Sequence, residues 1–254
     1  YTTGEVALSD REAVVSELGT VNAELNQAFW EVADGWHDAE TGVEVEAVYW
    51  RTSWIEKMLD HVLVHHRPSN GYSTAHWHTI RHSVCLQDRN GWFAALQQRS
   101  RQPYPEQLQR AIIAWNHPVL GTVTHSYASQ IRHAVQRGDS VSINHRLTEL
   151  LASYFDVLFA LNRMTHPGEK RLLDLAAEQC AMVPANMRTQ VEAVLRGVPR
   201  RRRGNAYIQA KLQERAARYA RYGDTVYLQV QRVRPSFPEV LNSRHHRPRV
   251  HGSL

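Results

Sequence analysis

Beyond Tyr104 the sequence is almost continuously patterned for amphipathic helices. Apolar residues recur at steps of three and four, and short stretches that contain Pro or Gly interrupt them. Helices are predicted over residues 108–115, 119–137, 142–163 and 169–180, with breaks at Pro118, Gly138-Asp139 and Pro167-Gly168. Successive helices with short connections pack against one another, so a helical bundle is predicted to about residue 197.

The N-terminal part of the chain has a different pattern. Asp10 is a plausible N-cap for a helix that runs to about Phe29, with an apolar stripe made by Val14, Leu18, Val21 and Leu25. Residues 43–49 alternate apolar and acidic side chains with period two, which predicts a strand. The helical pattern resumes over 53–63 and around Trp77 and Ile80, and an extended piece over 85–92 enters an Asn-Gly turn.

These patterns predict the α+β class. Residues 1–60 are expected to form a small α/β unit, residues 61–197 a helical domain, and residues 198–254 a basic tail that is partly disordered. The tail from residue 199 holds thirteen Lys and Arg against three acidic residues, which leaves seventeen basic and twenty-two acidic side chains in the rest of the chain. The tail could therefore contact phosphate backbones of nucleic acid, although no base-reading motif accompanies it.

Length and composition exclude several classes of protein. A chain of 254 residues is long enough for a hydrophobic core, and two cysteines do not make a disulfide scaffold. With no leader and no run of 18 apolar residues, we expect a soluble, cytoplasmic protein with no membrane partner. Walker, G-x-G-x-x-G and G-x-S-x-G motifs are absent, which argues against P-loop, Rossmann and serine hydrolase chemistry.

Two acidic residues lie on the predicted strand. Glu44 and Glu46 are two residues apart, so their side chains project from the same face, opposite Val43, Val45 and Ala47. Together they could bind one metal ion. The alternative is that they only solvate the open face of a half-buried strand. Phosphoryl chemistry with Mg²⁺ would require further acidic ligands on a neighbouring strand.

The predicted helix over 142–163 carries an acid in largely apolar surroundings. Asp156 could pair with Arg163 or Arg146 as a structural anchor, or it could have a raised pKa and act as a base. Asn144 and Arg146 lie in the first turns of this helix, and Lys170 and Arg171 begin the next one. Helix starts and basic side chains favour anions, so a phosphate site could form there, as could an ordinary charged solvent face.

Histidines offer a weaker metal hypothesis. His78 and His82 are four residues apart with His76 nearby, and His61 and His65 repeat that spacing. No H-E-x-x-H motif occurs and no carboxylate lies within residues 76–82, so aromatic or exposed packing is the simpler interpretation. A metal-dependent hydrolase that uses these histidines is a third, weaker alternative.

Several blocks of the sequence together resemble a bacterial family, the nucleotidyltransferase-like proteins with a DUF4037-type helical C-terminal region. The blocks are TGVEVEAVY at 41–49, GYST at 71–74, DRNGWF at 88–93, VSINHR at 141–146, LASYFDVLFALNR at 151–163 and HPGEKR at 166–171. The resemblance spans about residues 1–180 and is most specific around 141–171.

The resemblance implies a fold and an activity. Members join a small mixed sheet to a helical domain, bind a nucleoside triphosphate with Mg²⁺ between the two, and transfer a nucleoside monophosphate to a hydroxyl acceptor. Residues 1–60 then correspond to the C-terminal part of the nucleotidyltransferase domain. Glu46 matches the family's third metal-binding acid, with Glu44 as second choice. Asp156 is expected to accept the proton of the acceptor, and Lys170, with Arg171 or Arg146, to bind triphosphate oxygens.

The sequence departs from the family pattern at one important place. No Gly-Ser turn followed by D-x-D lies upstream of Glu46, and residues 1–4 resemble the stretch just past that motif. We therefore expect a fragment that is inactive or weakly active by itself, derived from an enzyme parent. The main alternative is a non-catalytic nucleotidyltransferase-fold module that binds a protein or nucleic acid.

Overall fold

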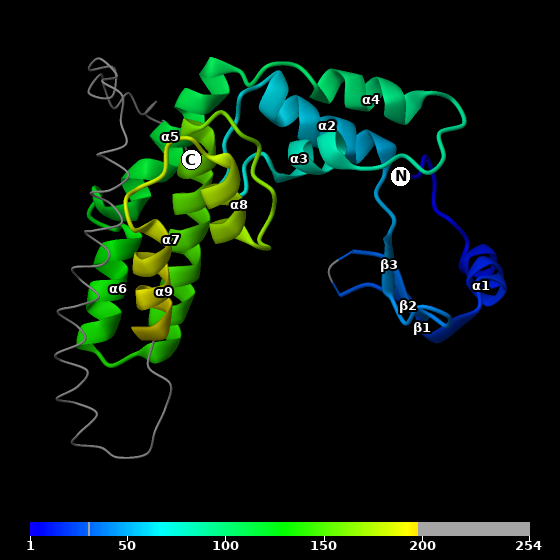
Figure 1. Cartoon of the computed structure of the whole chain (residues 1–254), viewed down its shortest axis with the longest axis horizontal. Helices are drawn as coiled ribbons and strands as arrows, with labels where there is room; N and C mark the ends of the chain where they lie inside the picture. Colours follow the sequence, from blue (N-terminus) through cyan, green and yellow to red (C-terminus); the bar gives the residue numbers. More distant parts are fainter. Residues whose placement is uncertain (30, 198–254) are drawn as a thin grey trace, which may run out of the picture.

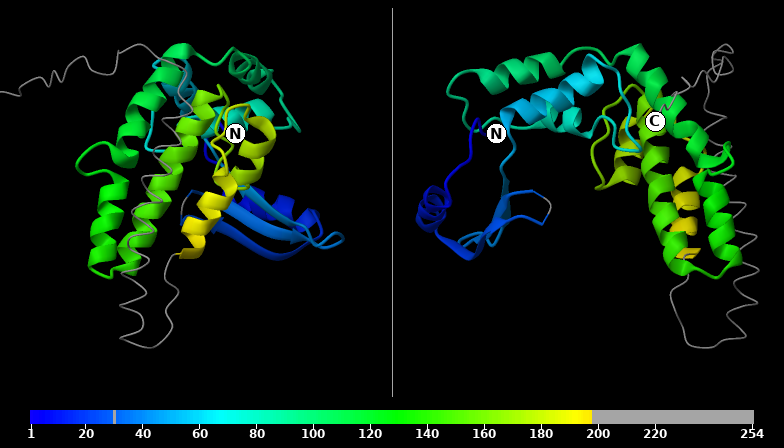
Figure 2. Two further views of the ribbon diagram at one scale, coloured as in Figure 1. Left: turned by 60° about the vertical axis from the view of Figure 1, so that its left-hand side comes forward. Right: turned by 180° about the vertical axis from the view of Figure 1, so that it is seen from behind.

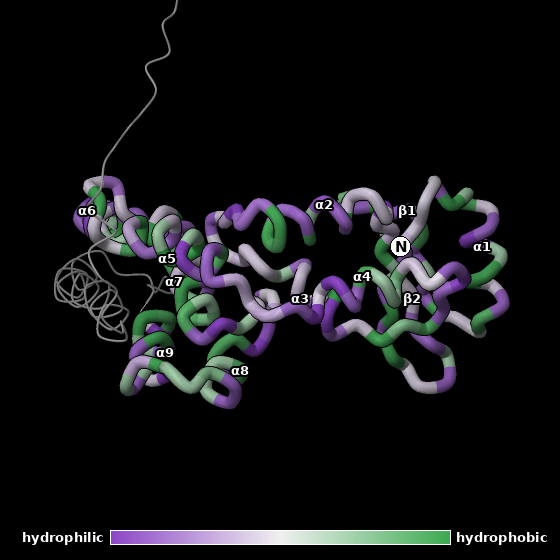
Figure 3. The backbone as a smooth tube through the Cα atoms, turned by 90° about the horizontal axis from the view of Figure 1, so that it is seen from above, coloured by the Kyte–Doolittle hydropathy of each residue, from purple (hydrophilic) through white to green (hydrophobic). Residues whose placement is uncertain are grey.

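The computed structural model describes residues 1–29 and 31–197, and these form an arch (Figure 1). One leg of the arch contains a helix and a three-stranded sheet, and helices α5 to α9 form the other leg. The bridge between the legs contains α2, α3 and α4, and the view from above shows the same linear order (Figure 3). The helices are α1 (Leu8–Glu17), α2 (Thr52–Leu63), α3 (Ala75–His82), α4 (Trp92–Ser100), α5 (Glu106–Gly121), α6 (Tyr127–Gln136), α7 (Ser140–Leu161), α8 (Leu172–Gln179) and α9 (Met187–Gly197).

The α+β class predicted from the sequence is confirmed. Strands β1 (Thr20–Gln27), β2 (Ala33–Asp38) and β3 (Glu44–Val48) form an antiparallel sheet in the order β1-β2-β3. Within the described part of the chain, the parallel pairing expected of a mixed sheet is limited to one bridge, between Thr2 and Arg51. The strand predicted over 43–49 is β3, one residue shorter at each end.

Helix α1 is attached to one face of the sheet by a buried ion pair. The guanidinium of Arg11 donates to the Asp34 carboxylate at 2.7 Å, and both side chains are almost fully buried. Tyr49 donates its hydroxyl to the other carboxylate oxygen at 2.6 Å, and the guanidinium also lies 5.0 Å from the Tyr49 ring centroid. Because removing either partner of a buried pair leaves an unpaired charge, this contact fixes α1 to the sheet.

The helix predicted from Asp10 to Phe29 was wrong in its second half. The helix ends at Glu17, Gly19 adopts a left-handed φ of +61°, and residues 20–27 pair with β2 as a strand. The expected apolar stripe is not buried, since Val14, Leu18 and Val21 are all exposed. Spacing alone could not separate the two structures, because the pairing with β2 that decides between them is non-local.

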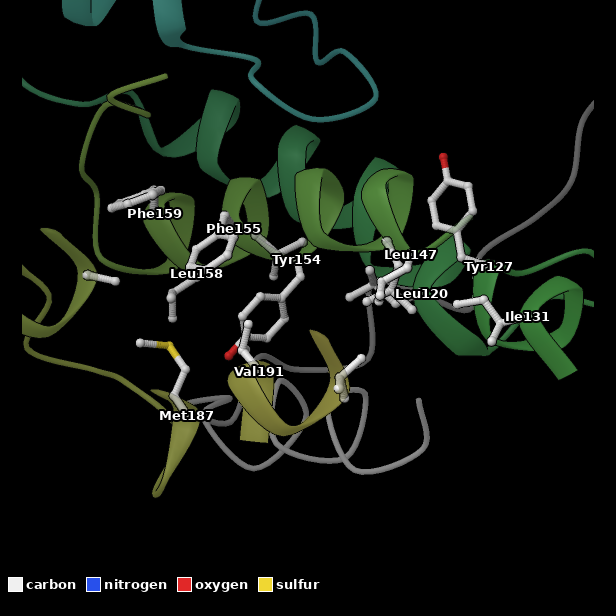
Figure 4. Packing of buried hydrophobic residues seen from close by; sticks show 14 of the residues in the cluster. Leu120, Tyr127, Ile131, Leu147, Tyr154, Phe155, Leu158, Phe159, Met187 and Val191 are labelled. Carbon is white, nitrogen blue, oxygen red and sulfur yellow. The ribbon is translucent and has the colours of Figure 1, made fainter. Parts of the chain in front are cut away.

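The buried apolar side chains gather in the helical region. One cluster joins α5 to α9 around the aromatic side chains of Tyr154, Phe155 and Phe159, with Met187 and Val191 of α9 packed below them (Figure 4). A second cluster joins α2, α3, α4 and α5 around Trp77, and Ala160 links it to α7. Figure 2 shows α6, α7 and α9 running side by side in both of its views.

The helical predictions are confirmed with shifted boundaries. The predicted helix at 142–163 is α7, which begins where the Asp139 side chain accepts the Ser142 N–H at 3.0 Å. Pro118 was expected to end a helix, but it lies inside the continuous α5. The actual break follows at residues 122–126, and Ser126 caps α6. Side-chain packing of α5 against α7 outweighs the hydrogen bond that Pro118 cannot make.

Domain boundaries are predicted after residues 60 and 197. The domain boundary predicted after residue 60 falls inside α2, whose buried side chains belong to the helical cluster. The basic tail from residue 198 lies outside the described residues. No helix within the described ranges has the length and apolar character needed to cross a membrane.

Candidate functional site

A buried carboxylate in α7 organises the loop that precedes α3. Asp156 is 1% exposed, and its Oδ1 accepts the backbone N–H of Ser73 at 3.0 Å. Its Oδ2 accepts the Ser73 hydroxyl at 2.5 Å and the amide group of Asn116 at 3.0 Å. Burial raises the pKa of Asp156 to about 7, against the opposing effect of the Ser73 hydrogen bonds. The predicted ion pairs with Arg163 or Arg146 do not form.

The same network reaches the glycine two residues before Ser73. Asn116 of α5 accepts the Gly71 N–H at 3.0 Å, and its amide group donates to the Ser69 carbonyl at 2.9 Å. Gly71 has a φ of +77°, and a Cβ there would lie 2.7 Å from the Ala152 Cβ on α7. Only glycine lets this loop approach the helix so closely. The loop 69–74 is therefore held by two helices at once.

A second set of polar contacts joins this loop to the segment after α7. Thr74 accepts the His166 N–H at 2.7 Å, and His166 Nδ1 accepts the Gly168 N–H at 3.1 Å. Burial lowers the pKa of His166 to about 3, so the ring is neutral at physiological pH. His78 contacts Thr165 at 2.8 Å through Nδ1, and burial lowers its pKa to about 4. These histidines are structural neighbours of the loop and remain uncharged.

The sheet presents three exposed acids on one face. Asp34 lies opposite Ala47 and faces α1, so the next residue, Gly35, and its partner Glu46 lie on the opposite face. By the same alternation Glu44, opposite His37, shares that face. Glu24 on β1 also lies opposite Gly35. We call this surface, with Glu24, Glu44 and Glu46 exposed on it, the acidic face.

The acidic face points toward the helical bundle. Helix α1, which covers the other face of the sheet, lies at the end of the arch away from the bundle in Figures 1 and 3. In the same two views α8 lies on the side of the bundle nearer the sheet. Lys170 and Arg171 are exposed at the start of α8, and Arg171 makes a loose ion pair of 3.7 Å with Asp174.

The structure does not bring all the predicted site residues together. Asp156 is buried inside the bundle, where Ser73 and Asn116 are its hydrogen-bond partners, whereas Glu44 and Glu46 are exposed on the sheet. Asn144 lies twelve residues before Asp156, about 18 Å along the helix axis, and donates to the Ser140 carbonyl of its own helix. Arg146 is half-buried near Tyr127, whose pKa is raised by burial and by Glu149 against a weaker opposing effect of Arg146.

Sequence reasoning missed several residues of this arrangement, among them Ser73, Asn116 and Glu24. Asn116 gave a usable signal, because it is polar between the buried positions Ile112 and Leu120 of an amphipathic helix. Glu24 gave none, because it lay in a segment that was interpreted as helical. The strand next to β3 places Gly35, and no acid, opposite Glu46, and the further acid on this face is Glu24 on β1, two strands away.

The described residues do not enclose a metal ion by themselves. Within ranges 1–29 and 31–197, no group of three His, Cys, Asp or Glu side chains is placed to hold one. His78 and His82 instead stack on each other, with ring centroids 4.0 Å apart. The exposed carboxylates fit Mg²⁺ only as it arrives on a nucleotide, because this ion typically takes one or two protein carboxylates plus phosphate oxygens and waters.

Comparison with known proteins finds one match, and it covers part of this site. Residues 73–172 match the family model DUF4037, a domain of unknown function. The DUF4037 segment begins at Ser73 and ends at Leu172, so it contains Asn116, Asp156 and His166 but excludes the sheet. No curated protein and no solved structure matches the chain.

Proposed function

We propose that this chain binds a magnesium–nucleoside triphosphate between the acidic face and the start of α8, as part of a nucleotidyltransferase that transfers a nucleoside monophosphate to a hydroxyl acceptor. One observation carries the proposal. The only face of the sheet left open by α1 carries Glu24, Glu44 and Glu46 and points toward the basic start of α8. A negatively charged sheet face and a basic segment on the side of the bundle nearer to it are suited to a metal–triphosphate complex, which carries charges of both signs.

Each charged group has a role in this proposal. Glu46 and Glu44 would bind the Mg²⁺ that arrives with the nucleotide, and Glu24 adds negative potential to the same face. The ion would neutralise charge on the triphosphate. Lys170 and Arg171 would bind phosphate oxygens and stabilise negative charge on the leaving pyrophosphate. Asn144 is assigned no role in this proposal, and its amide group donates to the Ser140 carbonyl of its own helix.

Asp156 is best explained as a positioning residue. A general base must reach the proton that it removes, and the carboxylate of Asp156 is sealed from solvent by Ser73 and Asn116. Its three hydrogen bonds fix the loop 69–74 instead. The role as proton acceptor predicted from the family resemblance remains untested.

The experiment measures binding of ATP to the full chain by calorimetry, with and without Mg²⁺. We expect binding that requires Mg²⁺, is weakened at least tenfold in Glu46→Ala, and is weakened similarly in the double variant Lys170→Ala, Arg171→Ala. Glu40→Ala and Lys57→Ala are the matched controls, since both residues are exposed and lie off the acidic face and off α8. Unchanged binding in Glu46→Ala would overturn the metal role. Turnover is then assayed with labelled triphosphates and a panel of hydroxyl acceptors.

A non-catalytic binding module is the second candidate. It is favoured by the lack of a three-ligand metal group in the described ranges and by the sealed carboxylate of Asp156. A module of this kind would bind nucleotide without dependence on Mg²⁺, or not at all. The same calorimetric titration therefore separates the two candidates.

A further inference from the structure

The loop 69–74 presents one aromatic side chain at the protein surface from a rigidly fixed backbone. Tyr72 lies between Gly71 and Ser73, and the N–H groups of these two neighbours donate to the buried side chains of Asn116 and Asp156. Tyr72 has a left-handed φ of +56°, which bulky residues seldom adopt. The Tyr72 side chain remains 37% exposed. Buried polar groups on two helices thus hold an exposed aromatic ring in a strained conformation.

The surroundings of the ring determine which part of a nucleotide fits there. One edge of the ring packs on His166, with centroids 4.8 Å apart and planes at 61°. Burial raises the pKa of Tyr72, and the nearby carboxylates of Glu169 and Glu149 raise it further, so both acids lie near its hydroxyl. Negative charge there disfavours phosphate, whereas Lys170, next to Glu169, favours it. An uncharged planar base can stack on the ring while the triphosphate extends toward Lys170.

We propose that Tyr72 is the residue on which the nucleobase stacks, and that Asn116 and Asp156 act through it as positioning residues. This inference rests on the proposed function, because it assigns the base end of the same nucleotide. It predicts that the base contributes to affinity independently of the phosphates. A stacked aromatic ring adds roughly tenfold or more to the affinity for each base.

The test compares Mg²⁺–ATP with Mg²⁺–tripolyphosphate, which lacks base and sugar, in calorimetric titrations of the full chain. Tyr72→Leu keeps an apolar side chain without the ring, and Tyr72→Phe keeps the ring without the hydroxyl. We expect Tyr72→Leu to weaken ATP binding about tenfold and to leave tripolyphosphate binding unchanged, while Tyr72→Phe binds both like the wild type. Phe29→Ala, which removes an exposed aromatic ring from the connection between β1 and β2, is the control for non-specific loss.

Each outcome decides between the two proposals. Equal weakening of ATP and tripolyphosphate in Tyr72→Leu would show a structural role of the side chain and would overturn the stacking inference. Unchanged ATP binding in Tyr72→Leu would overturn the stacking inference and leave the proposed function standing. If the wild type binds neither compound, both proposals fail.

Discussion

Two buried titratable side chains beside the loop 69–74 have pKa values shifted in opposite directions by the same cause. Burial disfavours the charged form of each, so it raises the pKa of the Asp156 carboxyl to about 7 and lowers that of the His166 ring to about 3. Their contributions to the pH dependence of stability therefore have opposite signs. Between about pH 4 and pH 6.5 they offset each other in the wild-type protein, and only single substitutions separate them.

Replacing Asp156 by a side chain that does not titrate should change how the free energy of unfolding depends on pH below pH 7. Because its folded pKa lies above its ordinary value of 3.8, the folded state holds more protons than the unfolded state between pH 4 and pH 7. The contribution of Asp156 to the free energy of unfolding thus falls by about 3 kcal/mol as the pH rises through that window. In urea titrations followed by circular dichroism, Asp156→Asn should lack this decrease. Parallel curves for variant and wild type would contradict the assignment.

The His166 titration should act in the opposite direction. Its folded pKa lies below its ordinary value of 6.5, so stability present above pH 6.5 is lost as the pH falls toward 4, by about 3 kcal/mol. His166→Phe, which cannot take up a proton, should be less sensitive to acid than the wild type over this range. The exposed His65 provides the control, because His65→Phe should leave the slope unchanged. A variant as acid-sensitive as the wild type would show that His166 titrates normally.

At the scale of an element, the loop 69–74 depends on how closely it approaches α7. Gly71→Ala must accept both a left-handed φ and a Cβ placed 2.7 Å from the Ala152 Cβ. Gly91 has a similar φ of +68°, but a Cβ there would meet nothing within 4 Å. We expect Gly91→Ala to lower the free energy of unfolding by about 1 kcal/mol, and Gly71→Ala by at least about 2 kcal/mol more. Chemical denaturation of both variants measures the difference, and equal losses would mean that the loop does not pack on α7 as described.

Local pattern predicted some elements well and others poorly, for identifiable reasons. The α7 helix was recognised because it combines a long apolar stripe with a capping residue, Asp139. The strand β3 was recognised by its alternation, which one open face of a sheet produces directly. Strand β1 was missed because its residues have an irregular, bulged register with β2 and bury little apolar surface. Its structure comes from pairing with β2, which the local pattern does not record.

At the scale of the whole molecule, the two legs of the arch differ in how much core they contain. Both hydrophobic clusters belong to the helical region, and among described residues before the end of β3 only Val15 and Ala33 are buried apolar side chains. The free energy of local unfolding is greater where more apolar surface is buried. Native-state hydrogen exchange should therefore be fastest in β1 to β3 and slowest in α7, with protection differing by at least a hundredfold. Equal protection in both legs would show that they unfold as one cooperative unit.

Only part of the candidate site was predicted, because the local pattern records spacing along the chain and not contacts between distant segments. Glu44 and Glu46 were assigned to one face of a strand from spacing alone, and their placement on an exposed face agrees with that assignment. Glu24 joins them only through the register of three strands. Asp156 was singled out as a buried acid in an apolar helix, but its partners, Ser73 and Asn116, are 83 and 40 residues away in sequence. No local pattern identifies contacts at that separation.

By itself the sequence determined the α+β class, the long buried helix and the chemistry of the side chains available, because periodicity and residue type are local properties. The tertiary structure decided which side chains meet. In that structure the acidic face lies toward the bundle, Ser73 and Asn116 cover Asp156, and Tyr72 is exposed. Those outcomes depend on strand pairing and on the packing of α5 against α7, which are set by the free energy of the whole fold.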